Sequence, residues 1–106
     1  MKTLIILVLF AFQQQPQIYS FNGVYSGTQS NSTVNLGWFI QDSYPNELSQ
    51  YTIMRGTQLV YSATLIGSRA YIVSIPVERG FKSATFTIQR SVNGVLSQTY
   101  STTVRK

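Results

Sequence analysis

The feature that most constrains the fold of this chain is a regular alternation of apolar and polar side chains. Between Thr33 and Ile40 four large apolar residues stand at every second position: Val34, Leu36, Trp38 and Ile40. Successive side chains of a β-strand point to opposite faces, so this set faces a core, and Asn35, Gly37 and Phe39 share the other face. The same period recurs along the chain between turn residues spaced roughly 8 to 12 apart, which predicts an all-β fold.

The alternation also predicts the strands that follow. One contains Tyr51 and ends at Arg55-Gly56, a second runs over 58–65, a third over 71–77, and a fourth carries the inward set Ala84, Phe86 and Ile88. Pro76 indicates that the third of these is an edge strand, since proline donates no ladder hydrogen bond. Asn93-Gly94, between two valines, predicts a two-residue hairpin turn.

The register of this hairpin sets up a conflict. If Val92 lies opposite Val95, then Ile88 lies opposite Thr99, because each step along one strand is matched by one step along the other. That register turns three apolar residues away from the core: Leu96, Tyr100 and Val104. Either a bulge shifts the last strand, or these three residues form an outward stripe available for interaction.

About seven strands are expected, and four segments carry a likeness to a known family: 33–38, 51–53, 71–77 and 86–94. With a tryptophan in the first and a tyrosine opening the second, they resemble a fibronectin type III or related immunoglobulin-like domain. The resemblance implies a seven-stranded antiparallel immunoglobulin-like sandwich over residues 18–106. Two departures matter: Phe86 stands where the family would place its corner tyrosine, and the loop at Asn93-Gly94 is too short for the adhesive loop of some members.

An uncharged apolar run from Leu4 to Phe12 precedes this domain, and residues 13–17 form a polar joint containing Pro16. The run is too short for a spanning helix of about 20 residues and fits the core of a secretory signal peptide. The residues after Ala11 make a poor cleavage site, so cleavage and retention both stay open. If retained, the run must bury its side chains in lipid, in a partner or in the core, and the anchor would be Leu4, Ile5, Ile6, Leu7, Val8, Leu9, Phe10 and Phe12.

The chain has no histidine and no cysteine, so the usual general bases, thiol nucleophiles and zinc ligands are missing. Its three carboxylates, Asp42, Glu47 and Glu78, are interpreted as solvated turn residues, and we expect no enzyme, no metal and no cofactor. The net charge is +5, but most basic residues lie singly along the sequence, so no specific nucleic-acid site is expected. Asn31-Ser32-Thr33 is a glycosylation sequon whose use depends on the host.

Four aromatic residues fall in the inward phase of their strands and are expected in the core: Trp38, Tyr51, Tyr71 and Phe86. The faces of the other aromatic residues are less determined. An open face lined by several of them would make carbohydrate binding credible.

Two functions remain. The first is a non-enzymatic structural protein, oligomeric with protein partners, that is held at a membrane or in a larger assembly such as a virus particle by its apolar segment. The second is a secreted or cell-surface binding or adhesion module that recognises protein or glycan after signal cleavage. Both imply export, membrane association or a place within a particle rather than a cytoplasmic enzyme.

Overall fold

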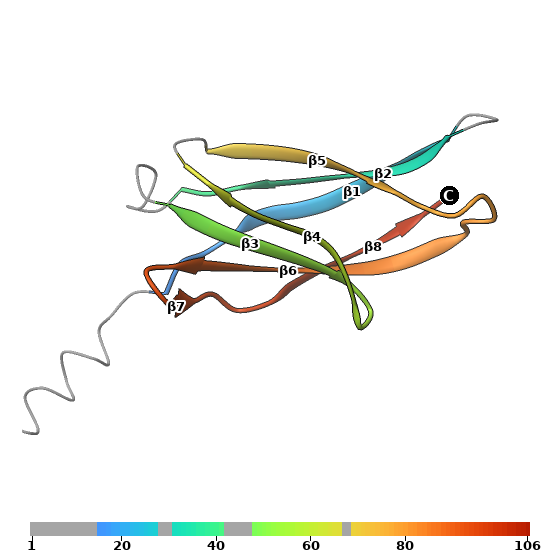
Figure 1. The fold of residues 1–106 in the computed structure, drawn as a ribbon. Helices are drawn as coiled ribbons and strands as arrows, with labels where there is room; N and C mark the ends of the chain where they lie inside the picture. The colour runs from blue at the N-terminus through green and yellow to red at the C-terminus, as the bar shows by residue number, and fades with distance from the viewer. Residues whose placement is uncertain (1–14, 28–30, 42–47, 67–68) are drawn as a thin grey trace, which may run out of the picture.

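The computed structural model describes residues 15–27, 31–41, 48–66 and 69–106. Over these residues the chain forms eight β-strands and no helix (Figure 1). The strands are β1 (Tyr19–Gly27), β2 (Ser32–Phe39), β3 (Ser49–Arg55), β4 (Gln58–Leu65), β5 (Ala70–Pro76), β6 (Ser83–Val92), β7 (Val95–Leu96) and β8 (Tyr100–Arg105). The expectation of an all-β chain is confirmed.

The strands form two antiparallel sheets in a sandwich-like arrangement, as Figure 1 shows. One sheet has the order β1-β2-β5, and the other has the order β4-β3-β6, with β7 and β8 both paired along the far edge of β6. The structure therefore has eight strands where seven are expected. The additional strand arises because the last expected strand is interrupted between Leu96 and Tyr100.

The alternating residues build the core between the sheets. Val34 and Leu36 are fully buried and Trp38 is 1% exposed, which confirms the face predicted for β2. Trp38 and the rings of Tyr51 and Tyr71 form a cluster with centroid separations of 5.1 to 5.4 Å. Contacts between tilted rings at this distance stabilise a core beyond the apolar area that they bury.

The last hairpin resolves the register conflict in favour of a bulge. Asn93 and Gly94 have φ angles of 51° and 80°, as this two-residue turn requires, and Val92 lies opposite Val95 as predicted. Beyond the turn, however, Ile88 lies opposite Tyr100 rather than Thr99. The returning strand contains one additional residue, so beyond that residue the side chains that would have faced outward face the core.

This shift corrects the outward stripe. Val104 is 2% exposed and belongs to the core, and Tyr100 packs against that core. Leu96 alone of the three remains outside, 54% exposed on β7 ahead of the shift. The three residues do not share a face.

The two sides of the sandwich differ. On one side β1 lies against β8 of the opposite sheet, close enough that a Cβ atom on Gly23 would come within 2.7 Å of the Val104 side chain. On the other side β4 and β5 are both edge strands, which confirms the edge position indicated by Pro76.

The polar joint ahead of β1 is built into the sandwich over its last residues. Pro16 is buried and Ile18 is 3% exposed, and the carbonyl of Gln17 accepts a hydrogen bond of 3.0 Å from Nη1 of Arg90. Pro16 and Gln17 of the joint are therefore part of the packed domain. The apolar run 4–12 lies outside the described residues.

Candidate interaction surface

The outer face of the β1-β2-β5 sheet is a candidate interaction surface because it carries no charge among the described residues. Its side chains follow from the pairing of the three strands and alternate with the core residues. They are Tyr19, Asn22, Val24, Ser26, Thr33, Asn35, Gly37, Phe39, Ala70, Ile72, Ser74 and Pro76. Exposed sheet faces normally display charged residues, so a face made only of neutral polar and apolar groups is suited to contact with a neutral or apolar partner.

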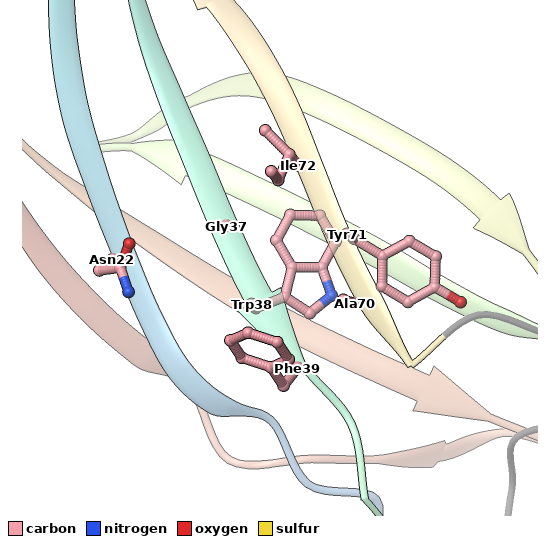
Figure 2. Close-up of a pocket in the computed structure, with 7 residues that line it drawn as sticks. All are labelled: Asn22, Gly37, Trp38, Phe39, Ala70, Tyr71 and Ile72. Atoms are coloured by element: carbon pink, nitrogen blue, oxygen red, sulfur yellow. The ribbon is translucent and has the colours of Figure 1, made fainter.

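A shallow depression of about 250 Å³ lies on this face where β2 has a glycine. Gly37 stands between Asn22 on β1 and Ile72 on β5, and Phe39 and Ala70 close one side (Figure 2). The depression exists because Gly37 has no side chain to cover the sheet at this point. A Cβ atom there would meet the Tyr71 carbonyl oxygen at 3.5 Å, an ordinary contact, so steric crowding does not require a glycine at this position.

The apolar rim of the depression is strongly exposed. Ile72 is 79% exposed and Phe39 is 47% exposed. Val24 extends the same apolar surface along β1, with 65% of its side chain in solvent. Burying such side chains contributes about 25 cal/mol per Å² of apolar area, so this face gains free energy when a partner covers it.

A bulge in β1 sets the position of Asn22. The register shifts between Tyr19 and Asn22, and Ser20 has a φ angle of 54°, which residues other than glycine rarely adopt. The bulge directs Phe21 inward, edge-on to Trp38 at 6.5 Å between ring centroids. Asn22 then faces outward, and its Nδ2 donates to the Ser20 carbonyl at 3.0 Å. Bulges commonly re-aim side chains in this way at interaction sites.

The chemistry that this surface offers is contact and hydrogen bonding. Of the residues that line the depression, Asn22 supplies the polar group, and none is a carboxylate, a lysine or an arginine. Farther along the face, Ser74 Oγ donates to Asn35 Oδ1 at 2.6 Å across the strands. The surface therefore fits recognition of a partner better than acid–base or nucleophilic chemistry.

Glu78, the one of the three carboxylates that lies within the described residues, forms an ion pair with Arg55. Arg55 donates to its two oxygens at 2.6 and 2.8 Å, and this bidentate bond lowers the pKa of Glu78 to about 2. A group that remains ionised down to such a pH is a poor general acid. Asp42 and Glu47 lie outside the described residues, as does the proposed anchor 4–12.

A second polar group, the Arg90 side chain, lies buried toward the end of the sandwich opposite the Arg55–Glu78 pair. Arg90 is fully buried on β6, and its Nε donates to Ser49 Oγ at 3.1 Å. Burial raises the pKa of the nearby Tyr51 hydroxyl, which the positive charge of Arg90 partly opposes. These contacts hold the joint and the strands together, so we interpret them as structural.

The aromatic residues expected in the core are found there. Trp38, Tyr51 and Phe86 are at most 1% exposed, and Tyr71 packs against them. Phe39 is the one strongly exposed aromatic side chain among the described residues, and the half-buried Tyr19 lies opposite it on β1. Asn31 of the sequon is exposed immediately ahead of β2.

The sequence analysis did not identify Asn22, Gly37 or Ile72 as site residues. A glycine within a strand was the available signal, because it often marks a bulge or a close approach of another molecule. The depression also requires the register across three strands and the bulge in β1, neither of which the sequence reveals.

Among the residues that the structure describes, no group of histidine, cysteine, aspartate or glutamate is placed to hold a metal ion. No helix within the described part of the chain is long and apolar enough to cross a bilayer.

Comparisons with known proteins gave no relative: no family model, no curated protein and no solved structure matches this chain.

Proposed function

We propose that this chain is a non-enzymatic β-sandwich module that acts by docking in a larger assembly. The observation that carries the proposal is the charge-free outer face of the β1-β2-β5 sheet, with its exposed apolar rim at Ile72 and Phe39. The partners are proteins, including further copies of the chain, and a minor structural role in a virus particle fits such a module. The proposal includes export or membrane association through the apolar segment 4–12.

We also propose that the fold is of the fibronectin type III or immunoglobulin-like kind. Its support is the strand order. If β1, β2 and β5 correspond to strands A, B and E, then β3, β6 and β8 correspond to C, F and G, and β4 extends the second sheet beside C. Strand β4 takes the place of C′ in that scheme.

The joint at Pro16 and Gln17 supports a role for the apolar segment as an anchor. Because Arg90 binds the Gln17 carbonyl and Pro16 is buried, the chain leaves the sandwich at a fixed place rather than through a free linker. Leu, Ile, Val and Phe each favour the bilayer centre by about 0.3 to 0.6 kcal/mol, so the run would contribute a few kcal/mol. That is enough for reversible attachment, and a partner would supply the rest.

Deletion of residues 1–15 tests the anchor. The core described above lies within residues 16–106, so the truncated chain is expected to fold and to lose association with membranes or particles. Flotation of the full and truncated chains with vesicles, followed by thermal melting of both, measures the two properties. A truncated domain that still co-purifies with the membrane would contradict the anchor, and so would a native chain whose mature N-terminus lies between Gln13 and Phe21.

Two substitutions on the outer face test docking directly. Ile72→Ser removes the most exposed apolar side chain, and Gly37→Val fills the depression without steric conflict at Cβ. Both are expected to weaken self-association or co-assembly about tenfold, measured by light scattering after size exclusion and by cross-linking, while stability changes by about 0.5 kcal/mol. The matched control is Leu59→Ser, which removes a 55% exposed apolar residue from the other sheet. Equal effects at Leu59 and Ile72, or no effect at Ile72, would contradict the proposal.

A second function, a secreted module that binds protein or glycan, has one specific observation in its favour. The depression combines the Asn22 amide with the Phe39 ring, a pairing that suits a sugar with one apolar face. A glycan array probed with the full chain and with Gly37→Val distinguishes the two functions, because only glycan binding in the depression predicts hits that the valine abolishes.

A further inference from the structure

The fold gathers at one end of the sandwich basic residues that the sequence disperses. Strands β3 and β8 end there, and the segment between β5 and β6 crosses it (Figure 1). We call this surface the basic end, and its cations are Arg55, Arg79, Lys82, Arg105 and Lys106. They are separated by up to 51 positions in the chain, from 55 to 106, and only Arg105 and Lys106 are adjacent, so the sequence does not reveal the cluster.

Backbone pairing places the members of this cluster side by side. Ser83 lies opposite Arg105, and the amide of Lys106 donates to the carbonyl of Lys82 at 2.9 Å. Arg55 belongs to the same end of the sandwich, because it lies opposite Phe86 on β6 and its guanidinium binds Glu78. These contacts connect three separate segments of the chain at the basic end.

The charge at this end is positive after the ion pair is counted. Glu78 neutralises Arg55, and among the described residues it is the one side-chain carboxylate. Arg79, Lys82, Arg105 and Lys106 are exposed, and the described residues provide no salt bridge to any of these four. Four unpaired cations concentrated at the tip of a domain create a local positive potential.

The aromatic residues beneath the basic end are already covered. Tyr25 and Phe81 stack at 5.4 Å with an interplanar angle of 4°, and Phe81 is 1% exposed. Arg55 Cζ lies 5.5 Å from the centroid of the Phe81 ring, and Lys106 Nζ lies 5.9 Å from that of Tyr25. These cation–π contacts hold the two charges at the surface and leave neither ring free to stack on a ligand.

We propose that the basic end binds a sulfated polysaccharide through charge alone. A linear chain of sulfate groups is bound by several exposed cations and needs neither an apolar contact nor an aromatic platform. Single-stranded nucleic acids are normally bound by stacking, for which this end has no free ring, and membrane binding by insertion requires apolar side chains beside the cations. In the segment 78–82 the apolar residue Phe81 is buried.

Position also separates this end from the anchor. The joint at Gln17 binds Arg90 near the start of β3, whereas the basic end lies at the far end of β3, at Arg55. At about 3.3 Å per residue the seven residues of β3 span roughly 20 Å. A chain attached by its N-terminal segment would present the basic end on the side away from that attachment.

The test uses the full chain with immobilised heparin as the sulfated probe. The variants Lys82→Gln and Arg105→Gln each remove one cation of the basic end, and Arg69→Gln removes one exposed cation immediately ahead of β5, outside this cluster. We expect the combined Lys82→Gln/Arg105→Gln variant to lose about tenfold or more in affinity at low salt and the slope of log affinity against log salt to fall by about 2, with about half of the slope change in each single variant. The control Arg69→Gln should change affinity less than twofold.

Three results would overturn the proposal. Equal losses in Lys82→Gln, Arg105→Gln and Arg69→Gln would mean that net charge, and not the basic end, governs binding. Binding to desulfated heparin as tight as to heparin would exclude sulfate recognition. Tighter binding to duplex DNA or to vesicles containing anionic lipid than to heparin, lost in the same cluster variant, would assign the end to phosphate ligands instead. Thermal melting of each variant confirms that these surface substitutions leave the fold intact.

Discussion

Arg90 and Ser97 face each other where the last strand exchanges its two faces. The amide of Arg90 donates to Ser97 Oγ at 2.9 Å, and the amide of Ser97 donates to the Arg90 carbonyl at 2.8 Å. The serine hydroxyl therefore takes the place of a backbone carbonyl in the ladder. This substitution allows one additional residue before Tyr100 without leaving a buried amide of β6 unpaired.

Replacement of Ser97 by alanine should destabilise the domain. The side chain is 4% exposed, and its loss leaves the Arg90 amide without its acceptor, which costs about 1 to 3 kcal/mol. Ser101→Ala is the matched control, since Ser101 is exposed on β8. Urea unfolding followed by tryptophan fluorescence measures both, and equal midpoints for the two variants would contradict the role assigned to Ser97.

Gly23→Ala should destabilise the domain by overpacking. The new Cβ atom would lie 2.6 Å from Leu36 Cδ2 and 2.7 Å from Val104 Cγ2, and both of these side chains are in the core. Overpacking of this kind costs about 1 to 3 kcal/mol. In Gly80→Ala the Cβ atom meets nothing within 4 Å, so the free energy of unfolding of that variant should lie within about 0.5 kcal/mol of that of the parent. A Gly23→Ala chain as stable as Gly80→Ala would show that β1 can move away from β8.

The Arg55–Glu78 pair should make stability depend on pH in the acid range. The folded-state pKa of Glu78 is about 2, below its ordinary value of 4.5, so the ionised pair stabilises the fold above pH 4.5. That contribution is lost as the pH falls from 4.5 to about 2, because the carboxylate becomes protonated. Melting temperatures of the parent and of Glu78→Gln should therefore differ at pH 7 and converge near pH 2. The difference should shrink in high salt because the pair is exposed, and a difference that persists at pH 2 would assign it to something other than the charge.

Arg90→Ala should both destabilise the sandwich and release the joint. The substitution removes a fully buried side chain together with its bonds to Ser49 and Gln17, for an expected loss of about 3 kcal/mol or more. Protease cleavage around residues 15–18 should become faster under native conditions. In Arg69→Ala, which truncates an exposed arginine, neither property should change. Unchanged cleavage in the Arg90 variant would show that Pro16 alone holds the joint.

The strands were predictable because a period of two is a local signal. Thr33 to Ile40 alternates except at Phe39, and the structure places a strand over Ser32–Phe39 with the predicted face inward. The range 58–65 is the observed β4. The local pattern could not decide between a bulge and an outward stripe. That outcome depends on whether the free energy gained by burying Tyr100 and Val104 outweighs the cost of interrupting the hydrogen-bond ladder. The sequence left both options open.

The surfaces were less predictable because they depend on distant segments. Arg90 is in phase with Ile88 and Val92, which placed it inward, but a charged residue is normally expected at the surface. The basic end combines residues from β3, β8 and the segment between β5 and β6, and only the folded topology brings them together. The depression at Gly37 likewise depends on distant segments. Its rim combines Ile72 on β5 with Asn22, whose position is set by the bulge at Ser20 on β1, two strands away.

The hydrogen bond between Arg90 and the Gln17 carbonyl also determines how the domain would carry a mechanical load. A pull on the segment ahead of Pro16 reaches β6 through the guanidinium at the same point at which it reaches β1. Strand β1 is an edge strand that could be peeled away one hydrogen bond at a time, whereas β6 is paired on both sides, with β3 and with β8. The domain is therefore arranged to resist tension applied at its N-terminal end with a central strand as well as an edge strand.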